Sequence, residues 1–239
     1  MGEAELNGMG VTNEFVSAAD PVGVLADGSH LYWTDTAGSS PNLGTETIAR
    51  ANLDGSGANQ NFISTPEDAG ALAGNTTYLY WTNYYSNSIG RANLDGSNVN
   101  QNFISGASKP EGVAVTRRYI FWTADTGTIG RANLDGSQVN QDFISGGSFP
   151  TMMTVHNGYL YWSNYLSGTI GRAILNGSDI DQSFITGASN PQGLVATRSY
   201  LYWSNEGTNT IARANIDGSN PNLSFVGTGY QPIGLTLIR

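Results

Sequence analysis

The sequence contains no cysteine, which excludes disulfide bonds, thiol catalysis and thiolate metal sites. It also lacks any apolar run approaching the roughly 18 residues that a membrane-spanning helix needs, so we expect no membrane insertion. The first residues, Met1–Glu5, are acidic and are not followed by the apolar region of a signal peptide.

Charged residues are scarce and unbalanced. They make up 12% of the 239 residues, the formal net charge is −9, and Lys109 is the only lysine. Binding to phosphate groups needs clustered Lys and Arg, so we expect no nucleic-acid partner. Gly, Asn, Ser and Thr supply the polar character instead, and this composition is typical of short strands joined by tight turns.

The five tryptophans all belong to one repeated motif. The motif occurs as Leu31–Asp35, Leu79–Asn83, Ile120–Ala124, Leu160–Asn164 and Leu201–Asn205. The tryptophans stand at positions 33, 81, 122, 162 and 203, so the intervals are 48, 41, 40 and 41 residues. A period of about 40 residues with an aromatic centre is typical of repeat proteins built from small sheets.

Each repeat predicts four strands. In the third repeat, an extended run introduced by Pro110 is followed by the aromatic strand around Trp122. A third strand runs over 128–134, and Asp135-Gly136, a strong hairpin signal, leads to a fourth strand around Phe143. The repeat therefore indicates blades of four antiparallel strands arranged as a propeller.

The two ends of the chain resemble parts of one further repeat. Ala4–Gly8 and Phe15-Val16 align with the third and fourth strands, and Gln231–Leu237 aligns with the first strand. We therefore predict one all-β domain over 1–239, a six-bladed β-propeller whose closing blade is shared by 1–20 and 231–239. That blade lacks its second strand. Three explanations remain open: the chain is part of a longer one, another chain supplies a strand by exchange, or the ring tolerates the defect.

The motif Leu31–Asp35, followed by Ile48–Gly55, resembles the YWTD repeat of the low-density-lipoprotein receptor group. The resemblance covers nearly the whole chain and implies a six-bladed propeller with the Tyr-Trp pair on the second strand of each blade. Only Asp35 keeps the motif's aspartate, and the cysteine-rich modules that flank receptor propellers are absent. We therefore expect a bacterial relative that is secreted or on the cell surface, with any leader absent from this chain.

Residues that recur in every blade are expected to serve the scaffold. The tryptophans should pack between blades, where a large ring buries the most area. One arginine per blade should tie the third strand to a neighbouring blade through hydrogen bonds. The Asp-Gly-Ser segments lack the carboxylate spacing of a calcium loop and are expected to be hairpin turns. The arginines are Arg50, Arg91, Arg131, Arg172 and Arg213.

Signals for catalysis are weak. His30 and His156 are isolated in the sequence, and no nucleophile elbow or phosphate loop is present. The residues at the start of each first strand include one carboxylate, a poor basis for a metal site; they are Val22, Gly70, Glu111, Thr151, Gln192 and Ile233. We predict no catalytic residue, cofactor or metal, while an enzyme of the lyase or lactonase type with chemistry at the central channel remains the alternative.

The residues that differ between repeats indicate a recognition surface. Loops before the first strand and after the second strand of each blade should share one propeller face, together with Lys109 and an insertion over 36–46. The predicted ligand-binding residues are Tyr84, Tyr85, Phe149, Tyr165, Tyr230, Glu111, Asp125 and Glu206. We predict a non-catalytic module that binds a protein, peptide or glycan; a structural repeat segment of a larger surface protein is a further alternative.

Overall fold

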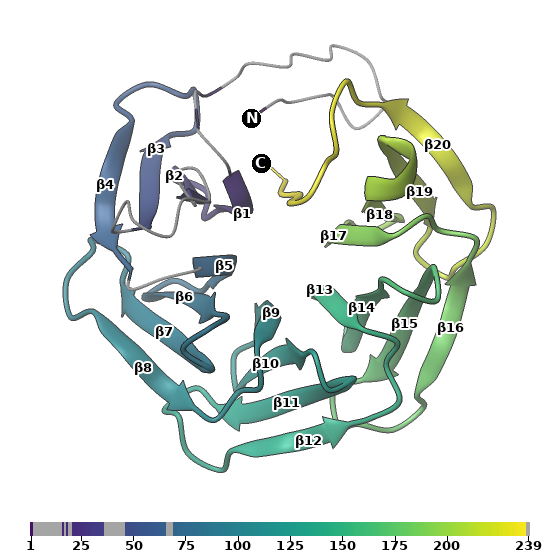
Figure 1. Ribbon diagram of the computed structural model, residues 1–239, viewed down its shortest axis with the longest axis horizontal. Helices are drawn as coiled ribbons and strands as arrows, with labels where there is room; N and C mark the ends of the chain where they lie inside the picture. The colour runs from purple at the N-terminus through teal and green to yellow at the C-terminus, as the bar shows by residue number, and fades with distance from the viewer. Residues whose placement is uncertain (2–15, 17, 19–20, 36–45, 66–68, 238–239) are drawn as a thin grey trace.

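Five four-stranded antiparallel sheets surround a central axis in the computed structural model (Figure 1). The structure describes residues 1, 16, 18, 21–35, 46–65 and 69–237. In each sheet the strands follow one another in chain order, with the first strand beside the axis and the fourth at the periphery (Figure 1). The described part of the chain therefore forms an all-β propeller with five blades.

The blades repeat with closely similar strand lengths. Blade 1 consists of β1 (Pro21–Ala26), β2 (His30–Asp35), β3 (Thr47–Asn52) and β4 (Asn59–Ser64). Blade 2 consists of β5 (Ala69–Gly74), β6 (Tyr78–Asn83), β7 (Ser88–Asn93) and β8 (Asn100–Ser105). Blade 3 consists of β9 (Pro110–Val115), β10 (Tyr119–Ala124), β11 (Thr128–Asn133) and β12 (Asn140–Ile144). Blade 4 consists of β13 (Pro150–His156), β14 (Tyr159–Asn164), β15 (Thr169–Ile174) and β16 (Asp181–Thr186). Blade 5 consists of β17 (Pro191–Ala196), β18 (Tyr200–Asn205), β19 (Thr210–Asn215) and β20 (Asn222–Gly227), with the 3₁₀ helix η1 (Glu206–Thr208) after β18. Within these residues, no helix is long and apolar enough to cross a membrane.

The tryptophans form the cores between the blades, as predicted. All five are fully buried. In blade 3, Trp122 Nε1 donates a hydrogen bond to Gln141 Oε1 at 3.2 Å, and Gln141 Nε2 donates to the Ser105 carbonyl of blade 2 at 3.1 Å. Gln101 and Gln182 repeat both bonds in blades 2 and 4. The glutamine on the fourth strand thus holds the buried indole and joins two blades.

A hydroxyl group on the second strand makes another link between blades. Thr123 Oγ1 accepts a hydrogen bond from the Gly112 N–H at 2.7 Å and donates to the Thr151 carbonyl of the next blade at 2.6 Å. The equivalent donors to the following first strand are Thr34, Thr82 and Ser163, and Ser204 donates to the Ile233 carbonyl in the C-terminal segment. These buried bonds fix the spacing of the first strands around the axis.

The Asp-Gly-Ser segments are hairpin turns, as predicted. In blade 3, Asp135 Oδ1 accepts hydrogen bonds from the Ser137 N–H at 2.9 Å and the Ser137 hydroxyl at 2.6 Å. Gly136 adopts φ +84°, a conformation that favours glycine. Asp135 Oδ1 therefore forms its hydrogen bonds within the turn.

The arginines support the scaffold in a way different from the prediction. Arg91 lies between two rings of its own blade, with Cζ 4.5 Å from the Tyr78 ring centre and 3.9 Å from that of Phe103. Arg131, Arg172 and Arg213 repeat this arrangement, and Arg50 lies over Phe62. The guanidinium groups stack within a blade, because cation–π contact on flanking rings stabilises a half-buried cation there.

The prediction of six blades with an incomplete closing blade is wrong, because the described residues form five. Residues 231–237 follow the axis but form no strand. The Ile233 carbonyl accepts hydrogen bonds from the Gly193 N–H at 2.6 Å and the Ser204 hydroxyl at 2.9 Å, and Thr236 Oγ1 accepts one from the Ala26 N–H at 3.1 Å. This segment therefore bridges blade 5 and blade 1 without a ladder partner of its own.

The remaining parts of the predicted closing blade, 2–15, 17, 19–20 and 238–239, lie outside the described residues. Strand exchange was inferred from the incomplete blade, so that prediction loses its basis.

Candidate functional site

Two sets of loops meet on one face of the propeller. One set joins the fourth strand of a blade to the first strand of the next, and the other joins the second strand to the third. Backbone hydrogen bonds connect them, such as Asp125 N–H to the Ser108 carbonyl at 3.2 Å and Tyr165 N–H to the Phe149 carbonyl at 3.1 Å. We call the surface formed by these loops the loop face. Hydrogen bonds between the loops hold its backbone in place.

Three blades present a side chain on the loop face from an unusual backbone conformation. Lys109, Phe149 and Asn190 have φ of +40°, +54° and +48°, and each directly precedes the proline that begins a first strand. Positive φ is uncommon for residues other than glycine, and Asn tolerates it best of these three. The same backbone position therefore carries a cation, an aromatic ring and an amide in successive blades.

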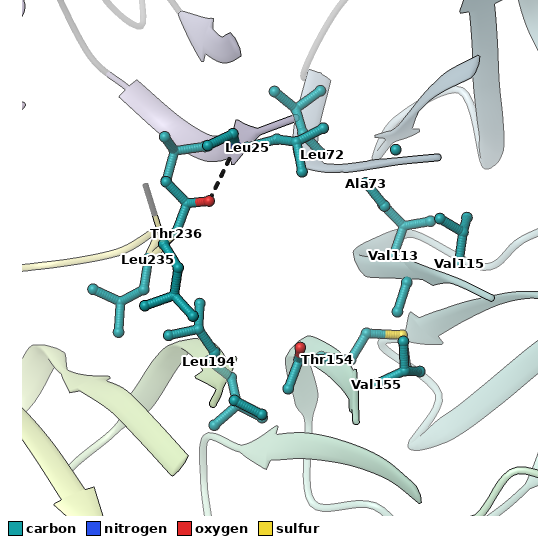
Figure 2. Close-up of a pocket in the computed structure, with 18 of the residues that line it drawn as sticks. Leu25, Leu72, Ala73, Val113, Val115, Thr154, Val155, Leu194, Leu235 and Thr236 are labelled. Atoms are coloured by element: carbon teal, nitrogen blue, oxygen red, sulfur yellow. Dashed lines mark hydrogen bonds between the residues drawn. The ribbon is translucent and has the colours of Figure 1, made fainter. Parts of the chain in front are cut away.

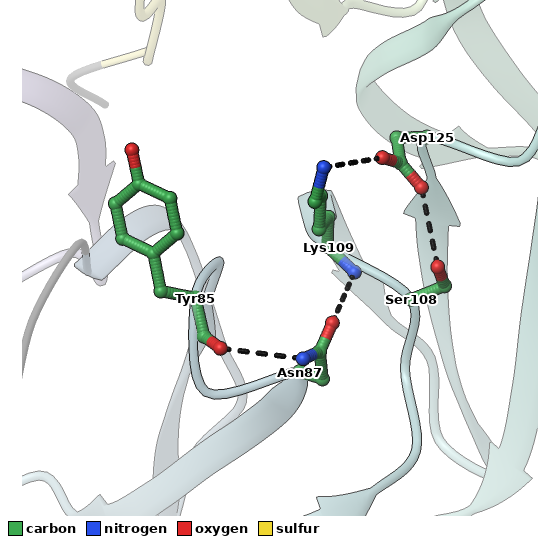
Figure 3. Close-up of polar contacts among 5 residues, drawn as sticks. All are labelled: Tyr85, Asn87, Ser108, Lys109 and Asp125. Carbon is green, nitrogen blue, oxygen red and sulfur yellow. Dashed lines mark hydrogen bonds and ion pairs between the residues drawn. The ribbon is translucent and has the colours of Figure 1, made fainter.

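Lys109 organises the first cluster of side chains, between blades 2 and 3 (Figure 3). Its Nζ lies 3.3 Å from Asp125 Oδ2, and its backbone N–H donates to Asn87 Oδ1 at 2.9 Å. Asp125 Oδ1 accepts a further bond from the Ser108 hydroxyl at 3.2 Å. The pKa of Lys109 is raised, chiefly by its bond to Asp125. The lysine is exposed, so the ion pair is expected to orient groups more than to stabilise the fold.

Two tyrosines extend this cluster into solvent. The rings of Tyr84 and Tyr85 meet edge to face with centres 5.1 Å apart, and Lys109 Nζ is 5.7 Å from the Tyr84 ring centre. Partial burial raises the pKa of Tyr84, and the charge of Glu111 adds to this effect. Tyr85 is 64% exposed. Tyr84, Tyr85, Glu111 and Asp125 therefore form one site with Lys109.

A second cluster lies between blades 4 and 5. Phe149 and Tyr165 meet edge to face with ring centres 6.1 Å apart. Burial raises the pKa of Tyr165, and the nearby Glu206 carboxylate adds to this through its charge and a hydrogen bond. Glu206 Oε2 also accepts a bond from Gln192 Nε2 at 3.2 Å. Phe149, Tyr165 and Glu206 therefore form the second cluster. As in the first cluster, a carboxylate lies next to aromatic rings.

One predicted residue stays apart, and several contributors were missed. Tyr230 is 82% exposed and belongs to neither cluster. Of the insertion over 36–46, residues 36–45 lie outside the described residues.

The prediction omitted Leu166, which is 71% exposed in the loop after β14. It also omitted two amide side chains that form hydrogen bonds within the clusters, Asn87 and Gln192. A hydrogen bond between residues of different loops cannot be recognised from the sequence of one repeat.

The entrance of the central channel offers little for metal binding. Glu111, Thr151 and Gln192 stand at the start of β9, β13 and β17. Across the described residues, no group of three or more His, Cys, Asp or Glu side chains could hold a metal ion. The side chains present can stack and form hydrogen bonds, which suits recognition.

Solved structures with a similar fold have been found. The chain is a β-propeller. Similar propellers include one in a nidogen/laminin complex, with 18% identity, a TM-score of 0.73 and coverage of 85% of this chain and 79% of that one. A gluconolactonase from Xanthomonas campestris has 15% identity, a TM-score of 0.73 and coverage of 96% and 82%. Virginiamycin B lyase from Staphylococcus aureus has 22% identity, a TM-score of 0.66 and coverage of 90% and 73%. No protein-family model and no curated protein matches the sequence. At these identities the likeness concerns the fold alone.

Proposed function

We propose that this propeller is a non-catalytic binding module that recognises a protein or peptide through its loop face. The observation that carries the proposal is the pairing of aromatic rings with carboxylates in two clusters on a fixed backbone. Tyrosine offers a large contact area at a low cost in rotamer entropy, which explains its frequency in binding surfaces. The carboxylates of Glu111, Asp125 and Glu206 outnumber the single lysine, so the expected ligand carries basic or hydrogen-bond-donating groups.

The exposed apolar area supports the same proposal. Tyr85 and Leu166 are 64% and 71% exposed, and each lies beside one of the two clusters. An exposed aromatic or aliphatic residue surrounded by polar groups is typical of an anchor that becomes buried in a complex. The propeller in the nidogen/laminin complex gives a precedent at the level of the fold.

Screening on peptide and glycan arrays tests the proposal. The purified chain is compared with the double variant Tyr85→Ala/Leu166→Ala, and the matched control is Val99→Ala/Ile180→Ala. Val99 and Ile180 are 44% and 46% exposed and lie beyond the Asp-Gly-Ser and Asn-Gly-Ser turns, away from the loop face. We expect a peptide ligand whose affinity falls roughly tenfold or more in the first variant only.

Three outcomes would overturn this function. They are equal binding by both double variants, selection of glycans without peptides, and turnover of gluconolactone or virginiamycin B by the wild-type chain. Turnover would favour the enzyme alternative, because the lyase and the gluconolactonase are enzymes with a similar fold.

A further inference from the structure

The two loop-face clusters repeat one arrangement of side chains between neighbouring blades. In each cluster, a tyrosine directly follows the second strand of one blade, and a carboxylate directly follows the second strand of the next blade. These pairs are Tyr84 with Asp125, and Tyr165 with Glu206. The residue directly before the first strand of the later blade is Lys109 in the first cluster and Asn190 in the second. The two clusters are therefore equivalent in position and differ in the residue between the tyrosine and the carboxylate.

The first cluster shows how a cation occupies this arrangement. Lys109 Nζ lies 3.3 Å from Asp125 Oδ2 (Figure 3), and it lies 5.7 Å from the centre of the Tyr84 ring. An ammonium group in this position is attracted by the carboxylate and by the negative face of the ring. The protein therefore contains its own example of a cation held between a tyrosine and a carboxylate.

The second cluster keeps the tyrosine and the carboxylate but has a neutral residue in place of the lysine. Asn190 adopts nearly the same backbone conformation as Lys109, with φ of +48° against +40°. Its side chain is shorter and uncharged. Glu206 accepts a hydrogen bond from the neutral amide of Gln192 at 3.2 Å, and among the described residues the only ion pair is that of Lys109 with Asp125. The carboxylate of the second cluster thus has no described cation as its partner.

We propose that the second cluster binds a cationic side chain of the peptide ligand, at the place that Lys109 Nζ occupies in the first cluster. This inference rests on the function proposed for the loop face and specifies which ligand group binds at which cluster. Glu206 supplies the counter-charge, and the half-buried rings of Tyr165 and Phe149 offer surfaces for stacking. Arginine is preferred to lysine, because its planar guanidinium group stacks on rings and forms paired hydrogen bonds with a carboxylate. Lys109 keeps a ligand cation out of the first cluster and so orients the ligand on the face.

This site is distinct from the axial cavity shown in Figure 2. In blade 5 that cavity is lined by Leu194, Val195 and Ala196, in the second half of β17, whereas Asn190 precedes the same strand. No side chain of the second cluster lines the cavity. Binding at the two places is therefore distinguished by the residues whose NMR signals change.

Titration with a small arginine derivative tests the inference on the wild-type chain. N-acetyl-L-arginine methylamide is added to the ¹⁵N-labelled protein, and N-acetyl-L-citrulline methylamide serves as the uncharged analogue of similar shape. We expect the amide signals of Tyr165, Asn190 and Glu206 to shift. The citrulline analogue should bind roughly tenfold more weakly, because it lacks the ion pair and the cation–π contact. Absence of these shifts, equal binding of the two compounds, or shifts confined to the cavity residues 194–196 overturns the proposal.

Exchanging the equivalent residues of the two clusters tests the place of binding. Asn190→Lys supplies a tethered cation, as in the first cluster, and should weaken binding of the arginine derivative roughly tenfold or more. Asn220→Lys is the matched control, because Asn220 has φ +52° in the same blade but lies in the turn between β19 and β20, away from the loop face. Lys109→Asn removes the tethered cation and should open a second site, with shifts at Tyr84 and Asp125. Wild-type affinity in a folded Asn190→Lys, or no second site in a folded Lys109→Asn, overturns the proposal.

A second variant keeps the test decisive if circular dichroism shows that Asn190→Lys does not fold. Glu206→Gln removes the counter-charge and should also weaken binding roughly tenfold, whereas Asp142→Asn, an exposed position on the outermost strand of blade 3, should leave it unchanged. Wild-type affinity in Glu206→Gln overturns the proposal.

Failure of this inference differs from failure of the proposed function. A peptide selected on the array that keeps its affinity after its arginines are replaced by citrulline and its lysines by norleucine overturns the inference, while the function of the loop face stands. Binding of the arginine derivative as expected, with no peptide selected on the array, supports the cation site and overturns the peptide-binding function.

Discussion

Replacing Gly130 by alanine should destabilise the propeller through a single buried ring. Gly130 lies opposite Trp122 on the neighbouring strand. A Cβ atom at Gly130 would overlap Cε2, Nε1 and Cζ2 of the Trp122 indole. The ring is fully buried, so it has no free volume into which it can move without disturbing its neighbours.

The cost has two parts. Overpacking in a core typically costs about 1–3 kcal/mol. A rotated indole would also break the bond from Trp122 Nε1 to Gln141 Oε1, and an unsatisfied buried donor costs about 1–3 kcal/mol. We expect a loss of about 3 kcal/mol in the free energy of unfolding, which lowers the Tm by roughly 6–12 °C for a chain of this length.

The first blade indicates how such a site accommodates alanine. Ala49 occupies the position opposite Trp33, where blades 2, 3 and 4 have glycine. In the described structure Trp33 Nε1 is buried without a hydrogen-bond acceptor. In blade 5, Ala212 lies opposite Trp203, and Trp203 Nε1 donates to Asn205 Oδ1 at 3.1 Å. In neither of these two blades does the indole bond to a glutamine on the fourth strand, which agrees with the loss of the Gln141 bond expected for Gly130→Ala.

A double-mutant cycle measures the contact between Gly130 and Trp122. Urea unfolding is followed by circular dichroism for Gly130→Ala, Trp122→Phe and the double variant. Phenylalanine lacks Nε1 and the fused ring, so Gly130→Ala should cost clearly less in the Trp122→Phe background. A cost below about 0.5 kcal/mol in the wild type, or an equal cost in both backgrounds, would refute the reasoning.

Two further predictions concern polar contacts of the scaffold. Thr123→Val should lower the free energy of unfolding by about 2–4 kcal/mol, because the Gly112 N–H and the Thr151 carbonyl lose their buried partner; Thr123→Ser should recover most of it, and equal urea midpoints for the two variants would contradict this. The second concerns pH: hydrogen bonds from the turn serines lower the pKa of Asp54, Asp95, Asp135 and Asp217 below the ordinary 3.8. Their contribution to stability is therefore present above pH 3.8 and is lost as the pH falls through the lowered values. Tm measured from about pH 5 to about pH 2 should fall less steeply when all four are changed to Asn, and an unchanged slope would rule this out.

The sequence predicted the local structure better than the closure of the ring. Repeated motifs identify the strands, hairpins and buried tryptophans, because these depend on neighbours in the same repeat. Gln231–Leu237 matches a first strand in sequence, yet it forms no strand, since a strand also needs a ladder partner that its own residues cannot reveal. Arg91 was assigned to a contact between blades, although Tyr78 and Phe103 of its own blade supply the rings.

The loop face was predicted only as a collection of residues. The face itself follows from strand order in a propeller, so Tyr84, Asp125 and Tyr165 could be assigned to it. The division into two clusters could not be predicted, because Tyr165 and Glu206 come from different blades and meet only through the packing of those blades.

The left-handed backbone before three of the prolines separates the requirements of folding from those of recognition. Asn190 occupies this conformation with the side chain that tolerates it well, whereas Lys109 and Phe149 do so at a conformational penalty. The lower-energy solution is therefore already present within the same molecule. A chain with Asn at 109 and 149 would relax that penalty and at the same time remove the cation and the ring from the loop face. At these two positions, stability favours asparagine, whereas ligand binding at the loop face favours the lysine and the phenylalanine.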